Sequence, residues 1–281
     1  MPVWPDPKTG TLRLSLVQFA PRLRDVHANH ARICELQQSA ADLVLTPELS
    51  LTGYDLRDGT ADVARKDFSS FTFPYPTLAG AVEAAGGVAY NVGLLAQPDR
   101  TAVIHRKVYL PTYGMFDEGR YFGRGDRVVP FEINGWRIGV LICEDFWHPA
   151  LAYLHAMQGM HALLVMAAAP GRGALAGGES GGFFASSDSW ERIARTTAQL
   201  YGVYVAVCNR CGVEGGVTFA GESIVVAPDA SVVARAGVDE QRLDVTLDFA
   251  EIAGARSPYA HLRDDDTRFV LSELERISRH A

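Results

Sequence analysis

The chain has 281 residues, of which 48% are hydrophobic and 21% charged, and its formal net charge is −7. This composition is typical of a globular protein that buries a large core, and it argues against disorder. The acidic balance offers no basic surface to a phosphate backbone, so we expect no nucleic-acid partner. The length suits one layered α/β domain over residues 1–281, with a tail from residue 257.

The N-terminal residues, the apolar runs and the cysteines indicate in which compartment we expect the protein and in which redox state its thiols. Residues 1–5 lack the basic start and apolar core of a signal peptide, and the longest apolar run, 162–169, is too short to span a bilayer. We expect a cytoplasmic protein with no membrane partner and with reduced thiols. Cys208 and Cys211 have the CxxC spacing but lack the second ligand pair that zinc needs, so we predict no metal site.

The first half of the chain opens with a β-α-β pattern. Leu12, Leu14 and Leu16 point the same way in a predicted strand over residues 12–19. A helical face follows over residues 26–40, and then a short buried strand over residues 43–46. Further strands are predicted at 88–95, 101–109, 136–143, 162–168, 204–208, 223–227 and 231–235, with Pro228 and Asp229 forming the last turn.

The clearest helix is predicted over residues 188–201, with Asp188 as N-cap and Glu191 completing a capping box. A terminal amphipathic helix is predicted over residues 267–278. Several strands are apolar on both faces while others alternate, which favours two sheets packed together and covered by helices. We therefore predict a four-layer α-β-β-α sandwich.

A buried strand ends in a thiol. The apolar run 138–142 is followed by Cys143, Glu144 and Asp145, and Pro149 suits the first turn of a helix. A cysteine at such a junction lies beside backbone N–H groups that can stabilise an oxyanion. We interpret Cys143 as a candidate nucleophile, and the alternative is a small buried hydrophobic residue.

A thiol nucleophile needs a base, yet none of the eight histidines stands at a comparable strand end. His105 and His148 are the nearest candidates. Glu48 does emerge at such a place, because it follows the buried strand 43–46 through Pro47. The alternative for Glu48 is an ordinary loop glutamate.

Lys107 lies within the apolar, strand-like stretch 103–110, which ends directly before Pro111. A lysine that is partly buried in such a stretch needs a carboxylate or an oxyanion nearby. The alternative is a solvated strand face that Lys107 shares with Arg106.

Three ordered segments resemble the three motifs of the nitrilase superfamily of carbon–nitrogen hydrolases. They are residues 45–54 around Glu48, 106–111 around Lys107 and 139–145 around Cys143. Segments 190–201, 208–210 and 221–223 are similar to the later parts of the family. The resemblance covers nearly the whole chain and implies one carbon–nitrogen hydrolase domain with the family's α-β-β-α sandwich.

The resemblance also implies catalytic roles. Glu48 is expected to be the general base, Cys143 the nucleophile that forms a thioester, and Lys107 the stabiliser of the oxyanion together with the backbone N–H of Glu144. Glu118 resembles the second glutamate that orients the catalytic group, although Asp117 and Glu144 are rivals for that role. No metal or organic cofactor is implied.

Residues 107–122 and 143–147 are particularly similar to the glutaminase domain of glutamine-dependent NAD synthetases. That likeness implies substrate-binding roles for Tyr113 and Glu144, and a pocket wall formed by Phe146 and Trp147. Aromatic residues such as these are also common in cores, so a core role for the wall residues stays open.

Two features depart from the glutaminase pattern. No synthetase domain is present in this chain, and residues 180–184 begin like an ATP-pyrophosphatase loop but lack the expected Asp at position 184. Residues 167–170 read Ala-Ala-Ala-Pro where many relatives carry Asn or Ser, which favours a less polar substrate.

We therefore expect an amidase that acts on a small linear amide, with nitrile hydrolysis as a minor variant. The alternatives are a glutaminase subunit that donates ammonia to a separate synthetase, and a catalytically silent scaffold on the same fold. The resemblance further implies a homodimer or a larger homo-oligomer.

Overall fold

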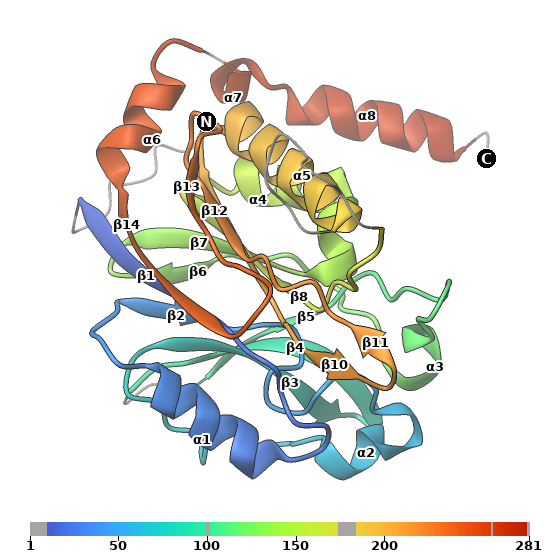
Figure 1. Ribbon diagram of the computed structural model, residues 1–281. Helices are drawn as coiled ribbons and strands as arrows, with labels where there is room; N and C mark the ends of the chain where they lie inside the picture. Colours follow the sequence, from blue (N-terminus) through green and yellow to red (C-terminus); the bar gives the residue numbers. More distant parts are fainter. Residues whose placement is uncertain (1–9, 99–101, 174–183, 260, 280–281) are drawn as a thin grey trace.

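The computed structural model describes residues 10–98, 102–173, 184–259 and 261–279. Within these residues two six-stranded sheets pack face to face, with helices on their outer sides (Figure 1). The strand order is β14-β1-β2-β3-β4-β5 in the first sheet and β13-β12-β9-β8-β7-β6 in the second. The fold is the predicted α-β-β-α sandwich.

The first sheet comprises β1 (Thr11–Gln18), β2 (Leu43–Leu45), β3 (Thr77–Ala85), β4 (Val88–Ala96), β5 (Val103–Arg106) and β14 (Gln241–Asp248). Its outer side carries α1 (Val26–Leu36) and α2 (Thr60–Val63), which follows the 3-10 turn Arg57–Gly59 (Figure 1). The short helix α3 (Glu118–Tyr121) follows β5 in the chain.

The second sheet comprises β6 (Phe131–Ile133), β7 (Trp136–Ile142), β8 (Ala162–Ala167), β9 (Tyr204–Asn209), β12 (Ile224–Val226) and β13 (Val232–Arg235). After β7 come the 3-10 turn Cys143–Trp147 and α4 (Pro149–Met157), which covers this sheet together with α5 (Ala185–Tyr201). A small hairpin pairs β10 (Val213–Glu214) with β11 (Val217–Thr218). The described chain ends in α6 (Phe249–Arg256), α7 (His261–Asp264) and α8 (Thr267–Ser278).

Two hydrophobic clusters lie on opposite sides of the first sheet. Leu12, Leu14 and Leu16 of β1 join the main cluster, which contains residues of both sheets, as their spacing predicts. Val17 belongs instead to a second cluster with Ile33 of α1, on the outer side of the first sheet. Much of β1, β2, β3 and β4 is thus buried on both faces, whereas the edge strands β5 and β14 are partly exposed.

Strand direction places the carboxyl ends of three strands together. In the first sheet β2 is parallel to β3, and β5 runs in the same direction because two antiparallel pairings, β3–β4 and β4–β5, separate it from β3. In the second sheet β7, β8 and β9 are parallel. Residues that follow β2, β5 and β7 are therefore available for a shared site, as is general in sheets of this kind.

Two elements end earlier than predicted, each because a polar group finds another partner. Helix α1 ends at Leu36 rather than at residue 40, since the buried side chain of Gln37 bonds Thr77 Oγ1 and the N–H of Tyr75. Strand β5 ends at Arg106 rather than at residue 109, because the N–H groups of Val108 and Tyr109 donate to Asp145. Residue 101, the predicted start of that strand, lies outside the described residues.

Helix α5 begins at Ala185, so the prediction of Asp188 as N-cap is wrong. The first N–H groups of the helix, on Ala185 and Ser186, donate to the carbonyls of Gly173 and Arg172. Backbone groups therefore satisfy this helix end without a side-chain cap. Asp188 instead pairs with Arg192 one turn on.

Several strands were missing from the prediction, most clearly β3 and β14. Strand β3 reads TLAGAVEAA, a sequence too rich in small residues to show strand character. In contrast, the predicted turn at Pro228 and Asp229 is present between β12 and β13, with Asp229 Oδ1 accepting from the N–H of Ser231 at 2.8 Å.

In the part of the chain that the structure describes, no helix combines the length and apolarity needed to cross a membrane.

Gly80 in β3 admits the segment that carries Glu48. A Cβ at position 80 would lie 2.3 Å from the N of Leu49 and 2.6 Å from the carbonyl oxygen of Pro47. We expect Gly80→Ala to displace this segment and to lower the free energy of unfolding by about 1–3 kcal/mol, measured by urea denaturation.

Gly254→Ala is the matched control, because its Cβ meets open space within α6. In this control the free energy of unfolding is expected to rise by about 0.5–1 kcal/mol, because glycine destabilises a helix interior by that amount relative to alanine. Equal stability of Gly80→Ala and the wild-type protein would contradict the close approach.

Candidate active site

Glu48 lies at the first strand end, three residues after β2, and is 1% exposed. Its Oε1 accepts a hydrogen bond of 2.6 Å from Lys107 Nζ and one of 2.9 Å from Asn91 Nδ2. Its Oε2 is buried and has no hydrogen-bond partner among the described residues. One oxygen of this carboxylate is therefore anchored and the other is available to accept a proton.

Lys107 lies at the second strand end, directly after β5, and is fully buried. Its Nζ donates to Glu48 Oε1 at 2.6 Å and to Glu118 Oε1 at 2.8 Å. Burial alone lowers the pKa of Lys107, but the charges of Glu118 and Glu48 outweigh it and hold that pKa well above its ordinary value. Lys107 is therefore a stable ammonium ion between two carboxylates.

Glu118 opens helix α3 and is 5% exposed. Its Oε1 accepts from Lys107 and, at 2.5 Å, from the hydroxyl of Tyr54. Burial raises the pKa of Glu118 to about 7, while Lys107 and the Tyr54 hydroxyl act in the opposite direction. Of the three rival carboxylates, Glu118 is the one that the structure places on Lys107.

Cys143 lies at the third strand end, where β7 passes into a 3-10 turn and Pro149 starts α4. Its φ of +49° is unusual for a residue with a side chain, and such strain clusters at functional sites. Burial, and then the charge of Glu48, raises the pKa of the thiol well above its ordinary value. The thiol is therefore neutral at rest, and a role as nucleophile would require a base.

Asp145 joins the two strand ends that carry Lys107 and Cys143. Its Oδ1 accepts from the N–H groups of Val108 and Tyr109 at 3.0 and 2.8 Å, and its Oδ2 accepts from Ile142 at 3.2 Å. The side chain is fully buried, and burial raises its pKa to about 7 although these N–H groups oppose the shift. Asp145 thus fixes the first sheet to the second beside the thiol.

Sequence reasoning assigned no role to Asp145, Asn91 or Tyr54. Asn91 is a buried amide inside the otherwise apolar end of β4, which is a recognisable signal because a buried amide requires partners. Tyr54 and Asp145 lie in segments 45–54 and 139–145, which resemble family motifs. The residues next to them in the sequence do not indicate which distant groups they contact.

The residues predicted to bind substrate divide into two groups. Tyr113 is 55% exposed, and its hydroxyl donates to Glu144 Oε2 at 2.6 Å. This hydrogen bond brings Tyr113 to Glu144, the residue that directly follows Cys143 in the chain. Phe146 is buried and stacks on Trp190 with ring centroids 6.1 Å apart. Trp147 is 45% exposed and meets the same Trp190 edge-on.

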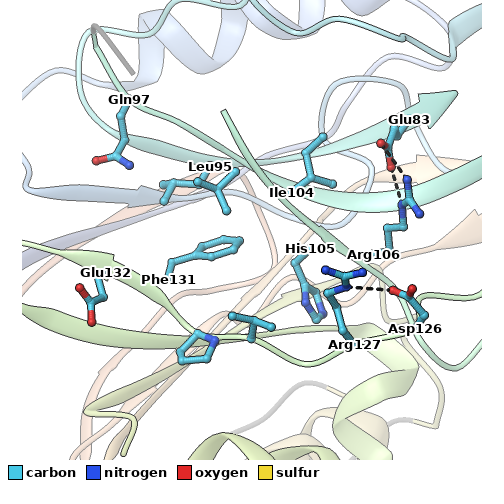
Figure 2. A pocket seen from close by; sticks show the side chains of 13 residues that line it. Glu83, Leu95, Gln97, Ile104, His105, Arg106, Asp126, Arg127, Phe131 and Glu132 are labelled. Carbon is cyan, nitrogen blue, oxygen red and sulfur yellow. Dashed lines mark hydrogen bonds and ion pairs between the residues drawn. The ribbon is translucent and has the colours of Figure 1, made fainter. Parts of the chain in front are cut away.

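Two cavities lie near these elements. One, of about 330 Å³, reaches Glu118 and Tyr54. Figure 2 shows another, of about 580 Å³, between β5 and residues 126–132 at the open edge of the sandwich. The ion pairs Glu83–Arg106 and Asp126–Arg127 close one side of it, and its lining does not include Lys107.

Within the described ranges, no group of three or more His, Cys, Asp or Glu side chains is placed to hold a metal ion. Cys208 and Cys211 are buried free thiols. Residues 180–183 of the loop that resembles an ATP-pyrophosphatase lie outside the described residues.

Comparison with known proteins agrees with the geometry. A family model described as carbon-nitrogen hydrolase matches residues 13–257. A glutamine-dependent NAD(+) synthetase of Xanthomonas campestris is 32% identical over 91% of this chain and 47% of its own length, so the chain spans about half of that relative. A protein of Pseudomonas protegens named "Hydrolase in pqqF 5'region" is 28% identical over 90% of this chain and 89% of its length.

Among solved structures, an amidase from Nesterenkonia sp. superposes with a TM-score of 0.73 at 24% identity. The superposition covers 95% of this chain and 97% of the amidase. At this identity the likeness supports the fold alone.

The Lys107 ammonium holds two buried carboxylates in place. We expect Lys107→Met to lower the free energy of unfolding by about 3–5 kcal/mol near pH 8, because Glu48 and Glu118 then face each other unpaired. The loss should shrink near pH 5, where Glu118 can take up a proton, because burial raises the pKa of this carboxyl to about 7. Urea denaturation at both pH values measures the effect.

Lys66→Met is the control, as Lys66 is exposed and the change is expected to cost less than about 0.5 kcal/mol. A Lys107→Met protein as stable as the wild type at pH 8 would show that the ammonium does not hold the two carboxylates.

Proposed function

Since the chain belongs to the carbon–nitrogen hydrolase family, we propose that it is an amidase that cleaves a small, non-peptide linear amide. Cys143 is the proposed nucleophile, Glu48 the general base and Lys107 the oxyanion stabiliser. The observation that carries the proposal is the buried cluster in which Lys107 bridges Glu48 and Glu118, close enough for their charges to act on the Cys143 thiol.

In this mechanism Glu48 Oε2 takes the thiol proton as Cys143 Sγ attacks the amide carbon. The oxyanion that forms is stabilised by the Lys107 ammonium and the backbone N–H of Glu144. Glu48 then returns the proton to the departing ammonia, and a thioester remains on Cys143. A water molecule activated by Glu48 releases the carboxylic acid and restores the thiol.

The neutral resting thiol suits this sequence of steps. Burial and the charge of Glu48 keep the proton on Cys143 until a substrate arrives, so the thiolate exists only during attack. The anchoring of Glu48 by Lys107 and Asn91 keeps its free oxygen available for the proton.

The substrate contacts belong to the mouth of the site. We propose that Tyr113 and Glu144, which are joined by a hydrogen bond, bind the polar part of the amide, and that Trp147 supplies an exposed wall. Phe146 supports this wall from behind, through the side chain of Trp190. Residues 167–170, Ala-Ala-Ala-Pro, add no polar side chain there, which favours a modestly polar amide.

A second candidate function is a glutaminase that supplies ammonia to a separate synthetase. It is favoured by the 32% identity to a glutamine-dependent NAD(+) synthetase, of which this chain spans only 47%. The two functions differ in substrate and in partner dependence, because a glutaminase subunit should turn over glutamine faster when its synthetase is added.

Ammonia release across a panel of glutamine, aliphatic amides, aromatic amides, ureides and nitriles tests the proposal. We expect turnover of at least one linear amide, a fall of at least about 1,000-fold in Cys143→Ala, and a fall of about 100-fold or more in Glu48→Gln. Intact-mass analysis of the wild-type protein should show the acyl adduct, which Cys143→Ala should lack.

Cys34→Ala is the matched control, since Cys34 is a free thiol on α1 and should leave turnover unchanged. Preference for glutamine with acceleration by a synthetase would favour the second function. Absence of both turnover and adduct with every compound would overturn the amidase and favour a silent scaffold.

We also propose a homodimer in the cytoplasm, as the family resemblance implies. The exposed apolar face of α8, made of Phe269, Leu271, Leu274 and Ile277, supports the dimer because no residue of this helix is buried against the described chain. Figure 1 shows α8 extending beyond α5, away from the two sheets. An apolar stripe of this kind is characteristic of a protein interface.

Leu274→Glu combined with Ile277→Glu should convert the dimer to a monomer in light scattering, because a charge in an apolar interface is costly. Ser272→Glu, on the opposite side of α8, should leave the mass at twice that of the chain. A dimer that withstands both apolar substitutions would place the interface elsewhere.

A further inference from the structure

A buried ion pair lies outside the three motifs that resemble the family. Arg210 follows β9 and Glu214 lies in β10; their side chains are 1% and 7% exposed. Arg210 NH1 donates to Glu214 Oε2 at 3.0 Å. Burying two charges is costly, so a pair of this kind needs further hydrogen bonds to be maintained.

Those further bonds connect the pair to the loop that follows Glu48. Glu214 Oε1 accepts from the backbone N–H groups of Tyr54 and Asp55 at 2.8 and 2.7 Å. Gly53 allows this approach, because a Cβ there would lie 2.9 Å from Glu214 Oε2. The β10–β11 hairpin thereby holds a loop that lies far away in the sequence.

Aromatic packing fixes the Tyr54 ring in the same place. The Arg210 guanidinium lies 4.1 Å over the ring of Phe219, and Phe219 meets Tyr54 edge-on with centroids 5.9 Å apart. Phe116 contacts Tyr54 in a second edge-on arrangement at 6.1 Å. With its backbone held by Glu214 and its ring held by two aromatic side chains, Tyr54 has little freedom to turn.

These contacts hold the Tyr54 hydroxyl against Glu118. It donates to Glu118 Oε1 at 2.5 Å, the same oxygen that accepts from Lys107. A hydrogen bond donated to a carboxylate favours its charged form. The orientation of this one hydroxyl therefore affects whether Glu118 remains charged beside Lys107.

We propose that Arg210 and Glu214 are positioning residues for the hydrolysis, and that they act by holding the Tyr54 hydroxyl on Glu118. The inference rests on the proposed amidase function. Neither residue needs to touch the substrate, because their effect passes through the loop of Tyr54. The titratable groups that act on Glu118 are Lys107 after β5, Glu48 after β2 and the Cys143 thiol after β7, with the Tyr54 hydroxyl on the loop between β2 and α2. Asp117 and Arg120 line the same cavity as Glu118.

The pH dependence of kcat/KM separates this role from a merely structural one. Activity that needs ionised Glu118 rises with pH through the pKa of that group, which lies at about 7. Tyr54→Phe removes a bond to the charged form, so the pKa rises and the acidic limb moves to higher pH by about 0.5–1 unit. A loss of structure alone would lower kcat/KM at every pH without moving the limb.

Glu214→Gln keeps the size of the side chain but places an amide N–H₂ against either Arg210 or the loop N–H groups. We expect the limb to move in the same direction as in Tyr54→Phe, and the double variant to show no further shift, because both changes act through one hydroxyl. An unmoved limb in Glu214→Gln, or shifts that add in the double variant, would overturn the proposal.

Two further variants make the test secure. Glu191→Gln is the matched control, since Glu191 is also buried and paired with an arginine, Arg235, and should lower stability without moving the limb. If Glu214→Gln does not fold, Arg210→Lys decides the matter. It keeps a cation beside Glu214 but loses the stacking on Phe219, so a smaller shift supports the proposal and no shift overturns it.

A measurement without substrate distinguishes failure of this inference from failure of the amidase function. Carbon-13 NMR titration of the glutamate carboxyl groups reports the pKa of Glu118 directly, with its signal identified by its absence in Glu118→Gln. A higher pKa in both Tyr54→Phe and Glu214→Gln supports the positioning role even if no amide is hydrolysed. An unchanged pKa in Glu214→Gln overturns that role even if hydrolysis is found.

Discussion

The site depends on one fully buried ammonium group, that of Lys107. A charge removed from water is expensive, and it is tolerated only where opposite charges and hydrogen bonds replace the water. Here Glu48 and Glu118 supply both, at 2.6 and 2.8 Å. Because the two carboxylates are themselves buried, each of the three groups requires the others, and the segments that carry them must converge for any one to be stable. The lysine thus organises the site as well as contributing its charge.

The sandwich brings those segments together through strand direction. Strands β2 and β5 point the same way in the first sheet, and β7 ends in the second sheet at the position of the thiol. The two sheets are then locked at this edge by Asp145, whose carboxylate accepts N–H groups that follow Lys107 and one that precedes Cys143. The N–H groups of Val108 and Tyr109 bond Asp145 instead of a neighbouring strand, so β5 is shorter than its apolar pattern suggests.

The layered fold and the strand-end residues were accessible from sequence because burial leaves a pattern. Glu48 and Cys143 follow apolar runs, and a carboxylate or thiol at the end of such a run is conspicuous. The groups that support them were not accessible. Tyr54, Asn91 and Asp145 act through partners that are distant in the chain, and such pairings leave no local periodicity. Strand β3 was missed for a related reason, since Gly80 is required by the close approach of Pro47 and Leu49 rather than by strand propensity.

The charge of the cluster explains why its parts suit the proposed chemistry. When Glu48, Glu118 and Lys107 are all ionised, the cluster holds one net negative charge beside the thiol, and this charge together with burial keeps Cys143 protonated. Transfer of the proton to Glu48 moves a charge without creating one, so it avoids most of the cost of forming a thiolate in a dry site. Attack on the amide then moves the negative charge from sulfur to the carbonyl oxygen, towards the Lys107 ammonium. At each step the buried site keeps the same total charge and changes only where that charge lies.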